Sequence, residues 1–273
     1  MGRTIDMALG DEVPDAVPAA TVILLRDGAD GLETLMLRRN SKLAFAGGHW
    51  VFPGGRVDQD DLEPSPEGDV PADEDARTLA AAKRAAVREA AEEAGLAVDV
   101  ERLVPFSHWT PPPVAIKRYA TWFFLAPAPE GDVTVDMGEI HDHQWARPAE
   151  ALRRRDAGEI ELSPPTWRTL ERLSHSATVA DALADAEAAT VEHFVTCIAS
   201  SGDALVAMWH GDAGYEAADA DLPGPRHRLW MVDGPWRFER WDAPAAGRPR
   251  PSTLPPTDEP SDEPTDERPT TED

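Results

Sequence analysis

Cysteine is nearly absent from this chain. Cys197 is the single cysteine among 273 residues, so no disulfide bond can form within the chain. A lone cysteine without partners most often behaves as a small apolar side chain. We therefore expect Cys197 to be a buried or half-buried residue with no role in the chemistry.

Long apolar runs are also missing. No run approaches the roughly 18 apolar residues that a membrane-spanning helix needs, and the N-terminus lacks the basic and then apolar pattern of a secretory signal. Hydrophobic residues still make up 41% of the chain, which is enough to form the core of one large domain. These features predict a globular protein of the cytoplasm that does not insert into membranes.

Basic residues are scarce relative to acidic ones. The chain has 26 Lys and Arg against 51 Asp and Glu, which gives a formal net charge of −25. Nucleic acids and anionic membranes would be repelled by such a charge, so we expect neither as a partner. The segment 59–76 is acidic and contains three prolines, and 245–273 is rich in Pro, Thr, Asp and Glu. We predict an acidic surface insert over the first segment and a disordered tail over the second.

Three glutamates stand together in the stretch REAAEEAGL, which begins at Arg88. On a helix, Glu89, Glu92 and Glu93 occupy positions i, i+3 and i+4, so their carboxylates share one face and repel one another. A hard divalent cation such as Mg²⁺ or Mn²⁺ would neutralise them, and the alternative is a solvated acidic face. Two features favour the metal site. The guanidinium of Arg88 can orient a carboxylate, and Gly95 stands at the position of a left-handed helix cap.

The same helical wheel predicts how the helix is placed. Ala82, Ala85 and Ala86 fall on the acidic face, whereas Ala91 and Ala94 fall on the opposite face. Methyl groups beside the carboxylates would leave room for a metal and a bulky substrate. We therefore expect the acidic face to be open and the opposite face to pack against the rest of the protein.

This stretch and the FPGG at 52–55 resemble the Nudix box, whose family pattern is G-x5-E-x7-R-E-U-x-E-E-x-G-U with U a bulky aliphatic residue. The second half matches at every position except that Ala90 is smaller than usual. The first half departs from the pattern, because Gly55 and Arg88 are 33 positions apart where the pattern has 14, so about 19 residues are inserted. Counting back eight positions from Arg88 reaches Ala80, which leaves the first glutamate of the pattern without a counterpart.

The resemblance implies an α/β (α+β) fold, the Nudix α/β/α sandwich with a mixed sheet. We expect the domain to span residues 19–244 after a flexible N-terminus at 1–18, and to end in an extension of helices and a β-hairpin over 163–244. The interrupted box is similar to that of a subgroup of Nudix proteins that includes peroxisomal coenzyme A diphosphatases.

The resemblance also implies roles for the residues of the box. Mg²⁺ or Mn²⁺ would be held by oxygen atoms of Glu89, Glu93, Glu92 and Gly55, the last through its carbonyl group. Arg88 would hold the acids in place. The general base stays open between Glu92, the later acid Glu139 and a carboxylate not yet identified.

The implied reaction is hydrolysis of the diphosphate bond in a small-molecule nucleoside diphosphate derivative. The subgroup points to coenzyme A or acyl-coenzyme A, whereas ADP-ribose or a dinucleotide would need the same box, since the box contacts only the diphosphate. A regulator that binds a nucleotide without hydrolysing it is a third hypothesis. Arg38, Arg39, Lys42 and Arg56 are candidates to bind a further phosphate, and the tryptophans near the C-terminus leave a homodimer open.

Apolar periodicity and turn residues predict the remaining elements. We expect a hairpin of strands at 20–26 and 33–39, a helix at 79–94 capped by Thr78, and a helix that starts after Ser163. A two-residue hairpin turn is expected at Asp233-Gly234. Further strands are expected at 50–52, 97–104, 117–126, 139–146, 204–210 and 226–241, and further helices at 148–152 and over 178–198, the latter at least as far as Ala188.

Overall fold

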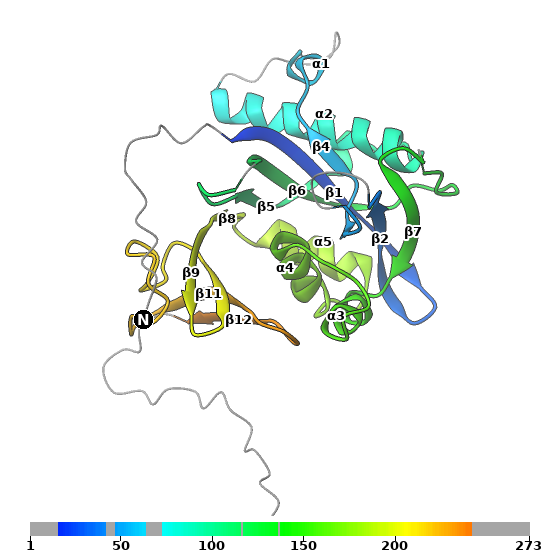
Figure 1. The fold of residues 1–273 in the computed structure, drawn as a ribbon. Helices are drawn as coiled ribbons and strands as arrows, with labels where there is room; N and C mark the ends of the chain where they lie inside the picture. Colours follow the sequence, from blue (N-terminus) through cyan, green and yellow to red (C-terminus); the bar gives the residue numbers. More distant parts are fainter. Residues whose placement is uncertain (1–15, 42–46, 64–72, 116, 136, 242–273) are drawn as a thin grey trace, which may run out of the picture. The chain divides into compact units, whose positions relative to one another are not determined.

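The computed structural model describes residues 16–41, 47–63, 73–115, 117–135 and 137–241 (Figure 1). The chain divides into two compact units, Met1–Asp242 and Ala243–Asp273, and every element below belongs to the first. The tail predicted over 245–273 and the middle of the predicted acidic insert lie outside the described residues. Within the described residues, no helix is long and apolar enough to cross a membrane.

A mixed sheet of eight strands forms the centre of the first unit. The order along the sheet is β3-β2-β1-β6-β5-β8, with β4 paired to β1 and β7 paired to β2. The β1–β6 and β5–β8 pairs are parallel and the others are antiparallel. Its strands are β1 (Val17–Gly28), β2 (Gly31–Arg39), β3 (Trp50–Val51), β4 (Gly54–Arg56), β5 (Val104–Thr110), β6 (Tyr119–Pro127), β7 (Ile140–Ala146) and β8 (Glu192–Val195).

The predicted hairpin is present and longer than expected. β1 and β2 pair in antiparallel register up to Gly28 opposite Gly31, and Gly31 has a φ of 116°, a conformation that glycine adopts without a steric cost. The middle of β1 is a continuous apolar run that is buried on both faces, as expected of a strand with layers on either side. The strand begins at Val17, inside the segment that was expected to be a flexible N-terminus.

Helices cover the two faces of this sheet, as Figure 1 shows. α2 (Glu74–Ala94) packs on one face, where its alanines meet Val22 and Leu24 of β1. On the other face, Trp167 and Leu170 of α4 pack with Ile23 and Leu25 of β1. The remaining helical segments are α1 (Gln59–Leu62), η1 (Val100–Arg102), α3 (Pro148–Asp156), α4 (Pro164–Leu173) and α5 (Val179–Ala188).

The box helix differs from its prediction in its start and in its packing. It begins at Glu74, after Asp73, whose side chain accepts a hydrogen bond from the Ala76 amide; the Thr78 hydroxyl donates to a backbone carbonyl within the helix instead of capping it. Gly95 ends the helix with a φ of 70°, as predicted. The predicted packing was wrong for Ala82, Ala85 and Ala86, which are buried, and for Ala91, which is exposed, whereas Ala94 is buried as predicted.

Two other predicted elements also needed correction. The strand expected at 97–104 starts only at Val104 and continues to Thr110, after the short helix η1. Helix α4 begins at Pro164 after Ser163, as predicted, although the Ser163 hydroxyl pairs with the Thr166 hydroxyl at 2.9 Å and not with a backbone amide.

A second sheet replaces the predicted C-terminal hairpin. Four antiparallel strands form it in the order β12-β11-β10-β9. The predicted two-residue turn at Asp233-Gly234 was wrong, since β11 ends at Met231 and β12 starts at Arg237, which leaves a five-residue connection. Trp209 lies fully buried with Trp109 and Phe194 and joins this sheet to the main core. The strands are β9 (Cys197–Ser201), β10 (Ala204–Met208), β11 (Arg226–Met231) and β12 (Arg237–Trp241).

Candidate active site

The glycine turn and the acidic helix meet because β4 pairs with β1. Gly54 lies opposite Thr21 and Gly55 opposite Ala20, while α2 packs over the same stretch of β1. Neither glycine could be another residue without displacing its neighbour. A Cβ atom at Gly54 would lie 2.4 Å from the Ala20 carbonyl oxygen, and one at Gly55 would lie 2.3 Å from Glu89 Oε1.

Glu93 is the most deeply buried acid of the helix. Only 5% of its surface is exposed, and its Oε2 atom accepts a hydrogen bond of 3.0 Å from the Gly54 amide. Burial raises the pKa of Glu93 to about 8, and repulsion from Glu89 and Glu139 adds to the effect, while the Gly54 amide and Arg39 oppose it. The positive charge near Glu93 is therefore too small to balance its ionised carboxylate, and a bound cation would stabilise the ionised form.

Glu89 lies one helical turn before Glu93, against Gly55. Burial is the largest cause that raises the pKa of its carboxyl group, and the charges of Glu92 and Glu139 act in the same direction against the lowering effect of Arg88. The absence of a side chain on Gly55 is what allows the Glu89 carboxylate to approach the turn. The structure thus brings Glu89, Glu93 and Gly55 together, as the sequence predicted.

Arg88 connects the acids around the turn. Its Nη1 atom donates to Glu89 Oε1 at 2.9 Å and to Glu92 Oε2 at 3.0 Å, and its Nη2 atom donates to the Arg56 carbonyl oxygen at 3.0 Å. The hydrogen bond with Asp61 is the largest cause that raises the pKa of Arg88, so the guanidinium stays charged. Arg88 therefore fixes the carboxylates of two acids, the arrangement that the sequence predicted for it.

Asp61 is the residue that the sequence interpretation missed. Its carboxylate is 5% exposed and accepts hydrogen bonds from Arg88 Nη2 at 2.9 Å and from the Asp58 amide at 2.9 Å. Asp61 stands six positions after Gly55, where the G-x5-E half of the pattern has its glutamate. Counting forward from the glycine would have found it, whereas counting back from Arg88 crossed the insertion. The insertion therefore lies between Asp61 and Arg88, and an aspartate occupies the first acidic position of the pattern.

Glu139 stands on the far side of the site, next to the start of β7. Its Oε2 atom is 3.3 Å from Arg39 Nη2, and Arg39 Nη1 is 4.0 Å from Glu93 Oε1. Arg39, one of the basic residues that the sequence offered for a substrate phosphate, thus lies between two acids of the site. The Glu139 side chain is 60% exposed, so it is accessible from solvent.

The chemistry of these donors fits a divalent cation. Glu89 and Glu93 are carboxylates whose pKa values are raised by burial and by repulsion from neighbouring acids, and a bound cation would relieve both effects. Within the described ranges, no three His, Cys, Asp or Glu side chains already form a group that could hold a metal. Glu92, predicted as a third ligand, is held by Arg88 with 59% of its side chain exposed. The fit therefore rests on Glu89, Glu93 and the Gly55 backbone.

Comparison with known proteins shows what the fold is similar to. No curated protein matches the chain. A NUDIX hydrolase from Alicyclobacillus acidocaldarius is 23% identical with a TM-score of 0.55, over 65% of this chain and 97% of that one. A MutT NUDIX hydrolase from Burkholderia pseudomallei is 23% identical with a TM-score of 0.41, over 58% and 98%. An Ap4A hydrolase from C. elegans is 24% identical with a TM-score of 0.39, over 58% and 96%.

A family model provides the assignment. The model described as the NUDIX domain matches residues 16–164, a stretch that contains the glycine turn, Asp61, the acidic helix and Glu139. The predicted fold class and the predicted enzyme class, a hydrolase of the Nudix type, are confirmed at the level of the family. This chain belongs to the NUDIX domain family.

Proposed function

We propose that the protein hydrolyses the diphosphate bond of a nucleoside diphosphate linked to another moiety, with Mg²⁺ or Mn²⁺ as its cofactor. The observation that carries the proposal is the buried Glu93 carboxylate, with a pKa of about 8, beside Glu89 and the Gly54-Gly55 turn. Burying an acid among other acids is costly unless a cation accompanies it. A diphosphate is the anion that such a cation would bind in turn.

The box residues would act together on the cation and the substrate. Glu89 and Glu93, with the Gly55 carbonyl, would hold the cation, which when bound neutralises charge on the diphosphate and lowers the pKa of a coordinated water. Arg88 keeps the Glu89 carboxylate turned toward the glycine turn. Asp61 in turn fixes the guanidinium of Arg88, so the positions of the ligands depend on it indirectly.

Two exposed acids are candidates for the general base. Glu92 and Glu139 have side chains that are 59% and 60% exposed, so either can meet a water that enters from solvent. Glu92 shares Arg88 with Glu89, whereas Glu139 pairs with Arg39. The base must take a proton from the attacking water as the bond to phosphorus forms. Separate Glu92→Gln and Glu139→Gln variants assign this role, since loss of the base lowers kcat more than KM.

The substrate is assigned by turnover of a panel with Mg²⁺. Coenzyme A, ADP-ribose and a dinucleoside polyphosphate differ in the group attached to the diphosphate, and chromatography of the products identifies which bond breaks. Preferred turnover of coenzyme A supports the subgroup that the interrupted box resembles, and preferred turnover of ADP-ribose or the dinucleotide selects the alternative. Binding without turnover of any member would leave the regulator hypothesis in place of the enzyme.

The Glu93→Gln variant tests the central role of this carboxylate. Replacing a residue that merely orients a metal ligand costs about 10–100-fold in activity, so loss of the ligand itself should lower kcat by more than about 100-fold. Glu74→Gln is the matched control, because Glu74 starts the same helix and is exposed. Full turnover by Glu93→Gln, measured on whichever substrate the wild type hydrolyses, would exclude the assignment.

A further inference from the structure

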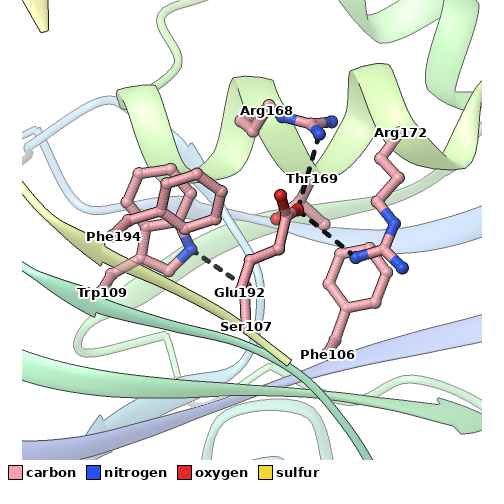
Figure 2. Close-up of a pocket in the computed structure, with 8 residues that line it drawn as sticks. All are labelled: Phe106, Ser107, Trp109, Arg168, Thr169, Arg172, Glu192 and Phe194. Atoms are coloured by element: carbon pink, nitrogen blue, oxygen red, sulfur yellow. Dashed lines mark hydrogen bonds and ion pairs between the residues drawn. The ribbon is translucent and has the colours of Figure 1, made fainter. Parts of the chain in front are cut away.

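Three arginines surround one glutamate on the side of the sheet that α2 does not cover. Arg168 and Arg172 come from α4, Arg240 comes from β12, and Glu192 begins β8. Arg168 Nη2 and Arg172 Nη1 lie 3.6 and 3.7 Å from Glu192 Oε2, and Arg240 pairs with the other carboxylate oxygen. Figure 2 shows the two arginines of α4 converging on the Glu192 carboxylate. We call this set the arginine groove.

Positive charge is in excess in the arginine groove. Arg168 has a second partner, Glu171, at 2.7 Å. Within ion-pair distance three guanidinium groups thus face two carboxylates, and the charge of Asp185 acts on Arg172 from further away. The contacts of Arg168 and Arg172 with Glu192 are longer than hydrogen bonds, which leaves N–H donors available for another acceptor. A local excess of positive charge is unexpected in a chain of net charge −25, where acidic residues are plentiful.

The arginines are partly desolvated, which strengthens their attraction for an anion. The side chains of Arg168 and Arg172 are 12% and 23% exposed, and they lie over the rings of Phe238 and Phe106 at 4.2 Å. Burial is the main cause that lowers the pKa of the Arg172 guanidinium. A charge that has lost much of its water is stabilised when an anion approaches it.

Two buried polar atoms beside the groove lack partners. Arg168 Nε and Thr169 Oγ1 have no hydrogen-bond partner in the described part of the chain, and Thr169 is 1% exposed. Thr169 lines a small cavity that shares Arg168, Arg172 and Glu192 with the groove. Buried polar groups are normally satisfied, so these two donors have unused hydrogen-bonding capacity beside the groove.

The groove has the size of a small-molecule site. Its volume is about 560 Å³, and it is open to solvent between α4, β8 and β12, whereas sites for small ligands commonly measure about 300–1,000 Å³. The helix α4 packs on the sheet face opposite the one that α2 covers. The arginine groove is therefore separate from the acids around Gly54 and Gly55.

We propose that the arginine groove binds a phosphate-bearing small molecule. Guanidinium groups recognise phosphate oxygens through paired N–H donors, and three of them from two elements can surround a tetrahedral anion. In the free protein Glu192 hydrogen-bonds Arg240 and partly neutralises the other two guanidinium groups, so it would compete with the ligand. The site does not depend on the hydrolase proposal, since it shares no residue with the box.

Calorimetric titration without divalent metal tests this site. In the presence of EDTA, inorganic pyrophosphate and AMP are titrated separately into the full chain, to compare phosphate alone with a nucleotide. The Arg172→Gln/Arg240→Gln double variant should weaken binding at least about tenfold, since charge-assisted hydrogen bonds are among the stronger ones. Glu192→Gln should tighten binding, because it removes the competing carboxylate. Arg237→Gln is the matched control on the same strand, with its side chain paired to Glu239.

The outcomes separate the groove from the box. Binding that survives Glu93→Gln and is weakened by the groove variants supports the proposal. Thermal melting checks that the double variant is folded. If the double variant is unfolded, the single Arg240→Gln variant is used in its place, because that side chain is 57% exposed. Equal affinity in the wild type, the groove variants and the control would overturn the proposal. No binding of either probe by the wild type at about 1 mM would overturn it as well.

Discussion

Arg88 illustrates how one residue organises the site through geometry. A guanidinium group offers five N–H donors in a rigid plane, and Arg88 uses them on Glu89, Glu92, Asp61 and a backbone carbonyl. The position of Arg88 directly before Glu89 would not by itself determine all of these contacts. Asp61 accepts hydrogen bonds from the Nε and Nη2 atoms of Arg88, whereas Glu89 and Glu92 accept from Nη1.

Replacing Asp61 should therefore impair catalysis without removing any group that meets the substrate. Asp61→Ala leaves Arg88 free to turn, so we expect kcat to fall by about 10–100-fold, the usual cost of losing a group that orients a metal ligand. Steady-state kinetics with Mg²⁺ titrated at each substrate concentration measure the loss. Asp61→Glu restores the residue that the family pattern has six positions after the glycine, and it should recover most of the activity.

Asp60→Asn is the control for this experiment, because Asp60 is exposed on the same short helix. If Asp61 only stabilised the fold, Asp61→Ala would lower thermal stability and leave kcat of the folded enzyme unchanged. Unchanged kcat in folded Asp61→Ala would thus refute the positioning role.

At the residue level, the sequence predicted much of the site. The spacing of Glu89 and Glu93 placed them on one helical face, and Gly55 was expected beside them. The wheel could not tell which face meets the sheet, and it assigned Ala82, Ala85 and Ala86 to open space. That choice depends on β1, whose buried residues come from another part of the chain, so helical periodicity alone does not determine it.

At the level of elements, a buried ion pair stabilises the connection between β10 and β11. Arg228 on β11 is fully buried, and its Nε atom donates to Asp212 Oδ2 at 2.7 Å. The amides of Gly214 and His227 donate to the same carboxylate. Burial opposes ionisation of Asp212, but the hydrogen bonds from Arg228 and these amides outweigh it and lower the pKa of Asp212.

Removing one member of this pair should be costly to stability. Asp212→Ala leaves the Arg228 charge buried without a partner, so the free energy of unfolding should fall by about 3–5 kcal/mol. Adding Arg228→Met removes the unpaired charge and should recover part of the loss. Urea denaturation of both variants measures the effect, and Asp203→Ala at an exposed turn should change it by less than about 0.5 kcal/mol. A double variant no more stable than Asp212→Ala would contradict the argument.

Long-range pairing explains which elements the sequence did not predict. Apolar periodicity predicted β1, β2, β6 and β7 within a few residues, because each shows a local pattern. The helix expected over 178–198 was wrong beyond Ala188, because β8 and the start of β9 occupy that stretch. Their pairing with β5 and β10 defines these strands more than their own composition does. Asp233-Gly234 is a common turn dipeptide, but the last pair of β11 and β12 is Trp230 with Arg237, two residues further along each strand than a two-residue turn would allow.

At the scale of the whole molecule, the sheet separates two kinds of chemistry. The face under α2 carries the acids of the box, and the face under α4 leads to the arginine groove. The formal charge of −25 conceals this division, because it averages over surfaces of opposite sign. Composition therefore predicted the absence of a broad basic surface and gave no indication of a local one.

The stability of the first unit should also depend on pH through a half-buried histidine. His108 on β5 lies 4.8 Å from the Trp122 ring and 5.5 Å from the His193 ring, and burial, with a smaller contribution from His193, lowers its pKa to about 4 from an ordinary value of 6.5. Between these two values, the unfolded chain binds more protons than the folded one. Stability from this group is thus complete above about pH 6.5 and is lost as the pH falls toward about 4.

The test compares the slope of the free energy of unfolding against pH in the wild type and in a variant. Urea unfolding of the wild type at several values between about pH 7.5 and about pH 4.5 should show a decline in the free energy of unfolding that is shallower in His108→Gln, since that variant has no proton to take up at this position. Carboxylates titrate in both proteins and cancel in the comparison. His175→Gln is the control, because the His175 side chain is 75% exposed, and its slope should follow the wild type. Equal slopes for the wild type and His108→Gln would mean that the packing of β5 against β6 and β8 does not exclude the charged imidazole.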